Sequence, residues 1–217
     1  MTTVPTGLLT TDTAEPPASD TPAPTVPLAR THLALGYLGF SATLFFLSLF
    51  HTALVPFEFI TAVFPMAIFF GGVAQFTAGI WAHQRRDHFA AVLFTSFAAF
   101  WLSYSLYTWR LLPPLVAEYG NAVTAATGSF TLAWGVLALF FTVAARAVDR
   151  ATFALMALAA AMFAGITAGQ YAVAPAIDLV GGVFALITAV LGLYIGAAHL
   201  INGGRDRVLL PLGPGSR

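Results

Sequence analysis

The sequence predicts an all-α integral membrane protein with six transmembrane helices and with both its N and C termini in the cytoplasm. Two observations about its composition support this. Hydrophobic residues make up 59% of the 217 residues and charged residues only 8%, whereas about a quarter of an ordinary globular domain is charged. The few charged residues also divide the chain into six apolar windows, and the distribution of arginine among their connections sets the orientation.

Each of the six windows lacks Asp, Glu, Lys and Arg and is 22 to 27 residues long. A helix crosses the hydrocarbon core in about 20 residues, so each window fits one crossing. Helices are required because hydrocarbon offers the backbone no outside hydrogen-bond partner, and the runs lack the alternation of a membrane barrel. Pro175 and Asp178 predict a tight hairpin between the last two windows. The windows are 31–57, 59–84, 88–109, 119–145, 151–177 and 179–204.

The arginines predict the orientation. Eight of the nine basic residues fall on one side of a six-span arrangement, and only Arg110 falls on the other. This asymmetry places the arginine-rich side, with both termini, in the cytoplasm. The use of arginine without lysine favours a bacterial inner membrane as the location. The eight residues are Arg30, Arg85, Arg86, Arg146, Arg150, Arg205, Arg207 and Arg217.

The parts of the chain outside the windows differ in composition. Residues 1–29 are rich in Thr, Pro and Ala, contain three acids and no base, and are predicted to be a disordered cytoplasmic tail. Residues 30–204 are predicted to be the six-helix transmembrane domain, and residues 205–217 a cytoplasmic C-terminal tail. The segment 113–128 is predicted to be the one other sizeable loop.

Several functional classes are excluded by what the sequence lacks. The net charge is zero and there is no basic block, so nothing indicates nucleic acid. There are no cysteines, and no HExxH or GxSxG motif or metal-ligand spacing of His and Asp is present. We therefore expect no enzyme activity, no metal and no cofactor. A permeation path or a purely structural bundle remains.

Polar residues within the windows are few. In "FFGGVAQFTAG" (69–79) the small residues favour close helix packing, while Gln75 must either bond a neighbouring helix or face a wet cavity. The hydroxyls of Thr95 and Ser96 more often bond their own helix. His51 and His199 fall near window ends, where a solvated histidine is favoured over a proton relay.

Two runs connected by the polar turn, "GGVAQFTAG" and "HFAAVLFTSFAAFWLS", closely resemble the signature region of the acetate uptake transporter family, the succinate–acetate permeases. "GYLGF" (36–40), "LAWGV" (132–136) and "VLLPLG" (208–213), with Tyr194 and Asn202, extend the resemblance over about residues 31–213. The resemblance implies a plasma-membrane homohexamer in which each protomer has its own narrow pore. It also implies transport of acetate and related small monocarboxylates, or of succinate, by proton symport or through a channel.

Specific residues follow from the resemblance by position. Phe40 and Phe97 match two aromatic residues of the pore constriction, and a third constriction residue would lie near Leu158 or Ala159. Gln75 matches the family glutamine. The few polar residues of the windows supply the other candidates: Thr43, Thr95, Ser96 and Tyr194, with Gln75, as pore-lining or substrate residues, and His51 and His199 as proton-linked residues.

The sequence also departs from the family pattern. The opening motif NPAPLG is "THLALG" (31–36) here, the family glutamates are replaced by Ala82 and His199, and a tyrosine by Phe97. These changes remove two acids and one hydroxyl that could serve proton coupling. Two alternatives therefore stay open: a channel for a neutral solute such as urea or a short amide, and a non-transport role as an assembly or regulatory membrane protein.

Overall fold

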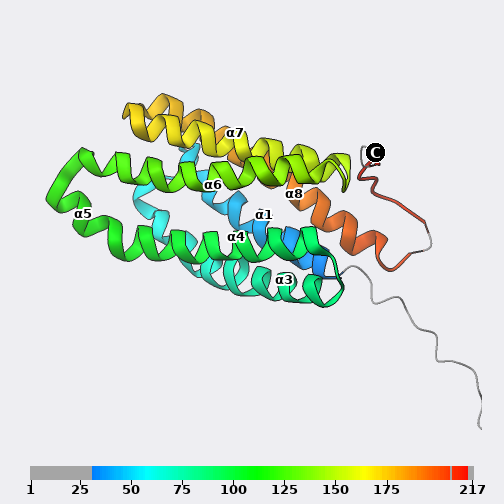
Figure 1. The fold of residues 1–217 in the computed structure, drawn as a ribbon. Helices are drawn as coiled ribbons and strands as arrows, with labels where there is room; N and C mark the ends of the chain where they lie inside the picture. Colours follow the sequence, from blue (N-terminus) through cyan, green and yellow to red (C-terminus); the bar gives the residue numbers. More distant parts are fainter. Residues whose placement is uncertain (1–30, 206, 215–217) are drawn as a thin grey trace, which may run out of the picture.

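A computed structural model describes residues 31–205 and 207–214, and all regular structure in them is helical (Figure 1). The predicted tail of residues 1–29 lies outside the described residues. The elements are α1 (Thr31–His51), η1 (Phe57–Val63), α2 (Phe64–Met66), η2 (Ala67–Ala74), α3 (Gln75–Gln84), α4 (His88–Leu106), η3 (Tyr107–Leu111), α5 (Leu112–Tyr119), η4 (Gly120–Ala122), α6 (Val123–Ala145), α7 (Arg150–Ala172) and α8 (Pro175–Asn202).

The ends of these helices follow from local sequence. Asp87 begins α4 by accepting a hydrogen bond from the backbone N–H of Ala90 at 3.0 Å, and Asp149 begins α7 by accepting one from Thr152 at 2.7 Å. Both are N-caps, which satisfy a helix N–H that has no partner within the helix. Helix α7 ends at Val173, whose φ of 50° is left-handed. Pro175 then opens α8, in the first helical turn, where its missing N–H costs nothing.

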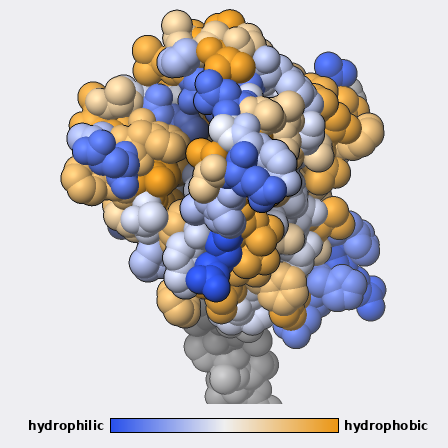
Figure 2. All heavy atoms as spheres, turned by 90° about the vertical axis from the view of Figure 1, so that its left-hand side faces the viewer, coloured by the Kyte–Doolittle hydropathy of each residue, from blue (hydrophilic) through white to orange (hydrophobic). Residues whose placement is uncertain are grey.

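The helices form an elongated bundle in which α1 packs along α8, α8 along α7, α7 along α6, and α3 along α4. The beginning of α1, the turns 85–87 and 146–149, the end of α8 and the C-terminal segment lie at one end, here called the terminal end (Figure 1). Helix α5 lies at the other, here called the α5 end. Figure 2 looks onto the α5 end, where hydrophilic residues are spread among apolar ones.

Five helical segments have the length and hydropathy to cross a membrane: Thr31–His51, Phe57–Gln84, His88–Ala145, Arg150–Ala172 and Pro175–Asn202. The third, of 58 residues, contains two of the predicted windows. It reverses direction at Gly120, whose φ of 55° and ψ of −135° are not helical, and α6 returns along the bundle above α4 in Figure 1.

One sequence prediction is wrong at this reversal. The segment 113–128 was expected to be a loop, but it is helical from α5 through η4 into α6. Pro113 and Pro114 lie in the first turn of α5, directly after the π-helical η3.

Glycines set the closest helix contacts. A Cβ built on Gly165 would lie 2.8 Å from Cα of Gly181, and one on Gly196 would lie 2.7 Å from Cγ of Leu38. Backbones approach this closely only where side chains are absent, which is how helices associate in lipid without a hydrophobic driving force. Gly71 and Gly72 lie in the π-helical η2, and Gly71 faces the ring of Trp101.

We expect Gly181→Ala to destabilise the protein in detergent, because its Cβ would lie 2.6 Å from the backbone nitrogen of Ile166. Overpacking of this kind costs about 1–3 kcal/mol. Thermal unfolding measured on purified protein tests the expectation. Gly204→Ala is the control, since nothing lies within 4 Å of its added Cβ, and an equal change in both variants would contradict the packing argument.

Candidate pore

Three cavities follow one another along the bundle. The terminal cavity has a volume of about 520 Å³, the central cavity about 10 Å³, and the α5 cavity about 230 Å³. Tyr37 lines both the terminal and the central cavity. The α5 cavity begins one turn further along the same helices, at Leu44 on α1 and Phe100 on α4. The three therefore lie in a row along the bundle, and this row is here called the interrupted path.

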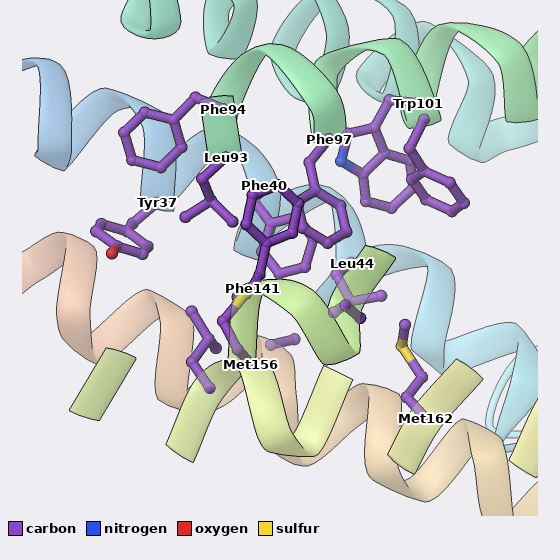
Figure 3. Packing of buried hydrophobic residues seen from close by; sticks show 14 of the residues in the cluster. Tyr37, Phe40, Leu44, Leu93, Phe94, Phe97, Trp101, Phe141, Met156 and Met162 are labelled. Atoms are coloured by element: carbon purple, nitrogen blue, oxygen red, sulfur yellow. The ribbon is translucent and has the colours of Figure 1, made fainter. Parts of the chain in front are cut away.

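The central cavity is the narrow point of this path. Phe40 and Phe97 are 3% and 1% exposed, and their ring centroids lie 4.9 Å apart. Figure 3 shows Phe40 from α1 and Phe97 from α4 directed toward one another, with Phe141 and Leu44 beside them. Phe97 also lies 5.8 Å from the ring of Phe141 on α6. An apolar ring of this kind excludes water and ions by dewetting.

Gln75 is the amide at this narrow point. It is the first residue of α3, immediately after η2, it is 1% exposed, and it lines the central cavity with Phe40 and Phe97. Its Oε1 has no hydrogen-bond partner among the described residues. A buried acceptor without a partner is costly. The sequence leaves two alternatives for this side chain, a bond to a neighbouring helix or a wet cavity, and both stay predictions, since a cavity of about 10 Å³ is at the limit for one water molecule.

The terminal cavity is polar. His32 and Asp87 lie 3.7 Å apart, from Nε2 to Oδ2, on its wall. The Tyr37 hydroxyl shares a hydrogen bond of 3.1 Å with Thr152, and the Thr152 hydroxyl in turn donates to Asp149 at 3.1 Å. These groups give the cavity wall hydrogen-bond partners that water and small polar solutes could use. The remaining lining residues are Leu33, Arg85, Phe89, Ala90, Val148, His199, Leu212, Gly213 and Pro214.

The α5 cavity combines aromatic walls with hydroxyls. Tyr107 and Thr127 share a hydrogen bond of 2.8 Å, and so do Thr131 and Thr167. Phe100 supplies an aromatic wall, stacked on Phe130 with centroids 6.3 Å apart. A small amphipathic solute would find both apolar surface and hydrogen-bond partners here.

The predicted histidines lie at opposite ends of the path. His51 lines the α5 cavity, and its Nδ1 is 3.3 Å from Oδ2 of Asp178. His199 lines the terminal cavity and stacks on Tyr37 with centroids 5.6 Å apart. Neither residue lines the central cavity.

The predicted hydroxyl residues lie elsewhere. Thr43 is buried and donates to the Gly39 carbonyl at 2.8 Å, and Thr95 donates to the Ala91 carbonyl at 2.7 Å, so both bond their own helices. Ser96 is half-buried, and Tyr194 donates to the Pro211 carbonyl at 2.7 Å. None of the four lines any of the three cavities.

On α7, the residues at the narrow point differ from the predicted one. Leu158 is half-buried and lines none of the three cavities, whereas Leu155 and Met156 line the central cavity. Ala159, the other expected position, is buried and lines none of the three cavities either. A constriction residue at Leu158 or Ala159 stays a prediction. Tyr37 was also missed, although it lies three residues before Phe40 and shares its helix face.

The path can now be compared with known proteins. The GPR1/FUN34/yaaH family matches residues 15–213. The chain belongs to this family. Members of the GPR1/FUN34/yaaH family similar to it include the succinate-acetate/proton symporter SatP of Escherichia coli (strain K12), which is 30% identical over 184 residues, or 82% of this chain and 93% of that protein. An uncharacterized protein of Methanothermobacter thermautotrophicus is 28% identical over 183 residues, which cover 82% of this chain and 88% of that protein.

A solved structure of the GPR1/FUN34/yaaH family has the same fold. The structure of the bacterial acetate channel SatP superposes with a TM-score of 0.74 at 26% identity, covering 84% of this chain and 98% of that one. The SatP relatives are thus named as a succinate-acetate/proton symporter and as an acetate channel, and the chain belongs to the same family of membrane transporters. No group of three or more His, Cys, Asp or Glu side chains that could hold a metal ion occurs among the described residues.

Proposed function

We propose that the protein conducts acetate and related small monocarboxylates across the membrane, through the interrupted path within each protomer. The observation that carries the proposal is the narrow apolar point, formed by Phe40 and Phe97, between two wider and more polar cavities. The family relation to the SatP proteins, whose names specify acetate and succinate, supports the same substrate class.

We further propose that the carboxylate crosses together with a proton, as the undissociated acid. No Asp, Glu, Lys, Arg or His is among the residues that line the central cavity. An isolated charge in this apolar surrounding would be costly. Gln75 offers the acidic O–H of the acid a buried acceptor in the Oε1 that lacks a partner, and this contact favours the neutral form over the anion.

The topology we propose has six crossings, because α4 and α6 are each long enough for one and are joined at the α5 end. The terminal end, which carries Arg85, Arg86, Arg146 and Arg150, faces the cytoplasm by the positive-inside rule. We place the protein in the plasma membrane, and the arginine-only composition favours a bacterial inner membrane.

We also propose a homohexamer, as the family resemblance implies. Two apolar faces remain exposed in the single chain: Phe69, Val73, Phe76 and Ile80 on η2 and α3, and Leu132, Val136, Leu139, Phe140 and Val143 on α6. A closed ring needs two different faces on each protomer. Native mass measurement in mild detergent should give six chains, and a monomer under all conditions would contradict the ring.

The experiment that tests the function is uptake of labelled acetate by proteoliposomes that contain the purified protein. Acetate uptake well above that of empty liposomes, with labelled urea at the empty-liposome level, supports the proposal. The second candidate is a channel for a neutral solute, which the uncharged narrow point and the unpaired Gln75 oxygen also suit. Urea uptake without acetate uptake would establish that candidate instead.

A further inference from the structure

The C-terminal segment has a structure that transport alone does not explain. Residues 208–214 have no regular structure, yet they are bonded to the start of α7 and to the last turns of α8, at the terminal end (Figure 1). They belong to the segment that the sequence predicted to be a tail, and to the run "VLLPLG" that matches the family. Leu212, Gly213 and Pro214 form part of the wall of the terminal cavity.

Two side chains of α8 hold this segment. The Asn202 Oδ1 accepts from the backbone N–H groups of Leu209 at 2.9 Å and Leu210 at 3.2 Å, and its Nδ2 donates to the Leu210 carbonyl at 2.8 Å. The Tyr194 hydroxyl donates to the Pro211 carbonyl at 2.7 Å. A segment that cannot satisfy its own backbone is thus satisfied by side chains from a neighbouring helix.

The third attachment is to α7. The backbone N–H of Ala151 donates to the Leu212 carbonyl at 3.0 Å. Because Ala151 lies in the first turn of α7, its N–H has no partner within the helix. The side chain of Leu212 also packs against the buried core. Gly213, with a φ of 78°, turns the chain past Arg150. A Cβ added to Gly213 would lie 3.1 Å from the Cβ of Arg150. The segment is therefore fitted to the rim of the terminal cavity.

We propose that residues 208–214 form a strap that restricts the terminal cavity, and that detachment of the strap opens the cytoplasmic mouth of the path. The restriction of the cavity does not depend on the proposed function. Only the assignment of this end to the cytoplasm, and of the cavity to a transport path, rests on it. The attachments suit a part that can open by itself: Val208, Leu209 and Pro211 are exposed, and Tyr194 is 36% exposed. Segments held by exposed hydrogen bonds and few buried contacts open locally before the whole protein does.

Access to a cysteine placed inside the cavity tests the strap. The natural chain has no cysteine, so a single one can be labelled without background. Ala90→Cys places a thiol at a position that lines the terminal cavity and is 1% exposed. Gln84→Cys is the reference, since Gln84 is exposed near the same end and does not line the cavity. The labelling rate by a charged maleimide is measured on purified protein in detergent.

The strap is loosened by Tyr194→Phe, alone and with Asn202→Ala. Tyr171→Phe is the matched control, because it removes an exposed tyrosine hydroxyl that bonds Ser129 at 2.8 Å, far from the strap. We expect the double substitution, which removes the four hydrogen bonds that these two side chains make to the strap, to raise the labelling rate of the Ala90→Cys thiol about tenfold or more. The Gln84→Cys thiol and the Tyr171→Phe control should not change.

Two outcomes would overturn the strap. In one, the Ala90→Cys thiol is labelled at the same rate with and without the loosening substitutions, which means that residues 208–214 do not restrict the cavity. In the other, labelling of Ala90→Cys and Gln84→Cys rises equally, which means that the substitutions loosen the whole terminal end. Because labelling needs no transport, either result can be told apart from a failure of the proposed function in the acetate uptake assay.

Discussion

Replacing Phe97 with alanine should admit longer carboxylates to the path. The centroid of the Phe97 ring lies 4.9 Å from that of Phe40 and 5.8 Å from that of Phe141. The ring also lines the central cavity of about 10 Å³. Removing the ring enlarges the narrow point by several methylene volumes. Each methylene that an apolar site accepts or rejects is worth about 10–200-fold in selectivity. We therefore expect the initial rate of butyrate uptake relative to acetate to rise about tenfold or more.

The measurement is uptake of each labelled acid by proteoliposomes, after folding has been checked by thermal unfolding. Truncating a buried phenylalanine costs about 3–5 kcal/mol, so a matched control must lose similar stability. Phe50→Ala meets this need: Phe50 is buried in the same core but lines none of the three cavities. Phe97→Tyr should have a mild effect. A folded Phe97→Ala protein with unchanged acid preference would make Phe97 a core residue only.

Acetate uptake should fall steeply as external pH rises. If the undissociated acid crosses, the rate follows its fraction in solution. For a simple carboxyl group with a pKa of about 4.3, that fraction falls about tenfold per pH unit between pH 6 and 8. Uptake falls as pH rises because the residues that line the central cavity include no charged group to stabilise the anion, which is the form that a higher pH produces. Uptake measured at constant total acetate, with the internal pH fixed, should follow this slope.

Histidine substitutions separate this mechanism from a protein-borne proton relay. His51 faces Asp178, and His199 stacks on Tyr37, at opposite ends of the path. Histidine is the side chain that commonly relays protons near neutrality, so a relay through either residue would change the pH profile of uptake when that residue is removed. We expect His51→Ala and His199→Ala to keep the slope. Steady acetate currents that follow voltage and ignore pH would instead show that the bare anion crosses.

Some features of the site could be predicted from the sequence, and others could not. The family resemblance paired Phe40 with Phe97, and the structure brings their rings into contact. On α7, where no motif fixes the alignment, the resemblance pointed to Leu158 or Ala159, whereas Leu155 and Met156 line the central cavity. Thr43 and Thr95 were candidates for the pore because hydroxyls are rare in these windows, but each bonds the carbonyl four residues earlier, which is the outcome that the sequence favoured for Thr95. A sequence does not distinguish an inward hydroxyl from one bonded to its own helix.

The sequence by itself determined that the chain is a helical membrane protein, because the hydrophobic composition and the spacing of charges are properties of each segment alone. It also determined the family, through residues at fixed spacing. Only the tertiary structure decided that residues 113–118 are helical, that the rings of Phe40, Phe97 and Phe141 meet, and that residues 208–214 are tied to Asn202 and Tyr194. These depend on how helices rotate and approach one another, and packing between distant segments sets those angles.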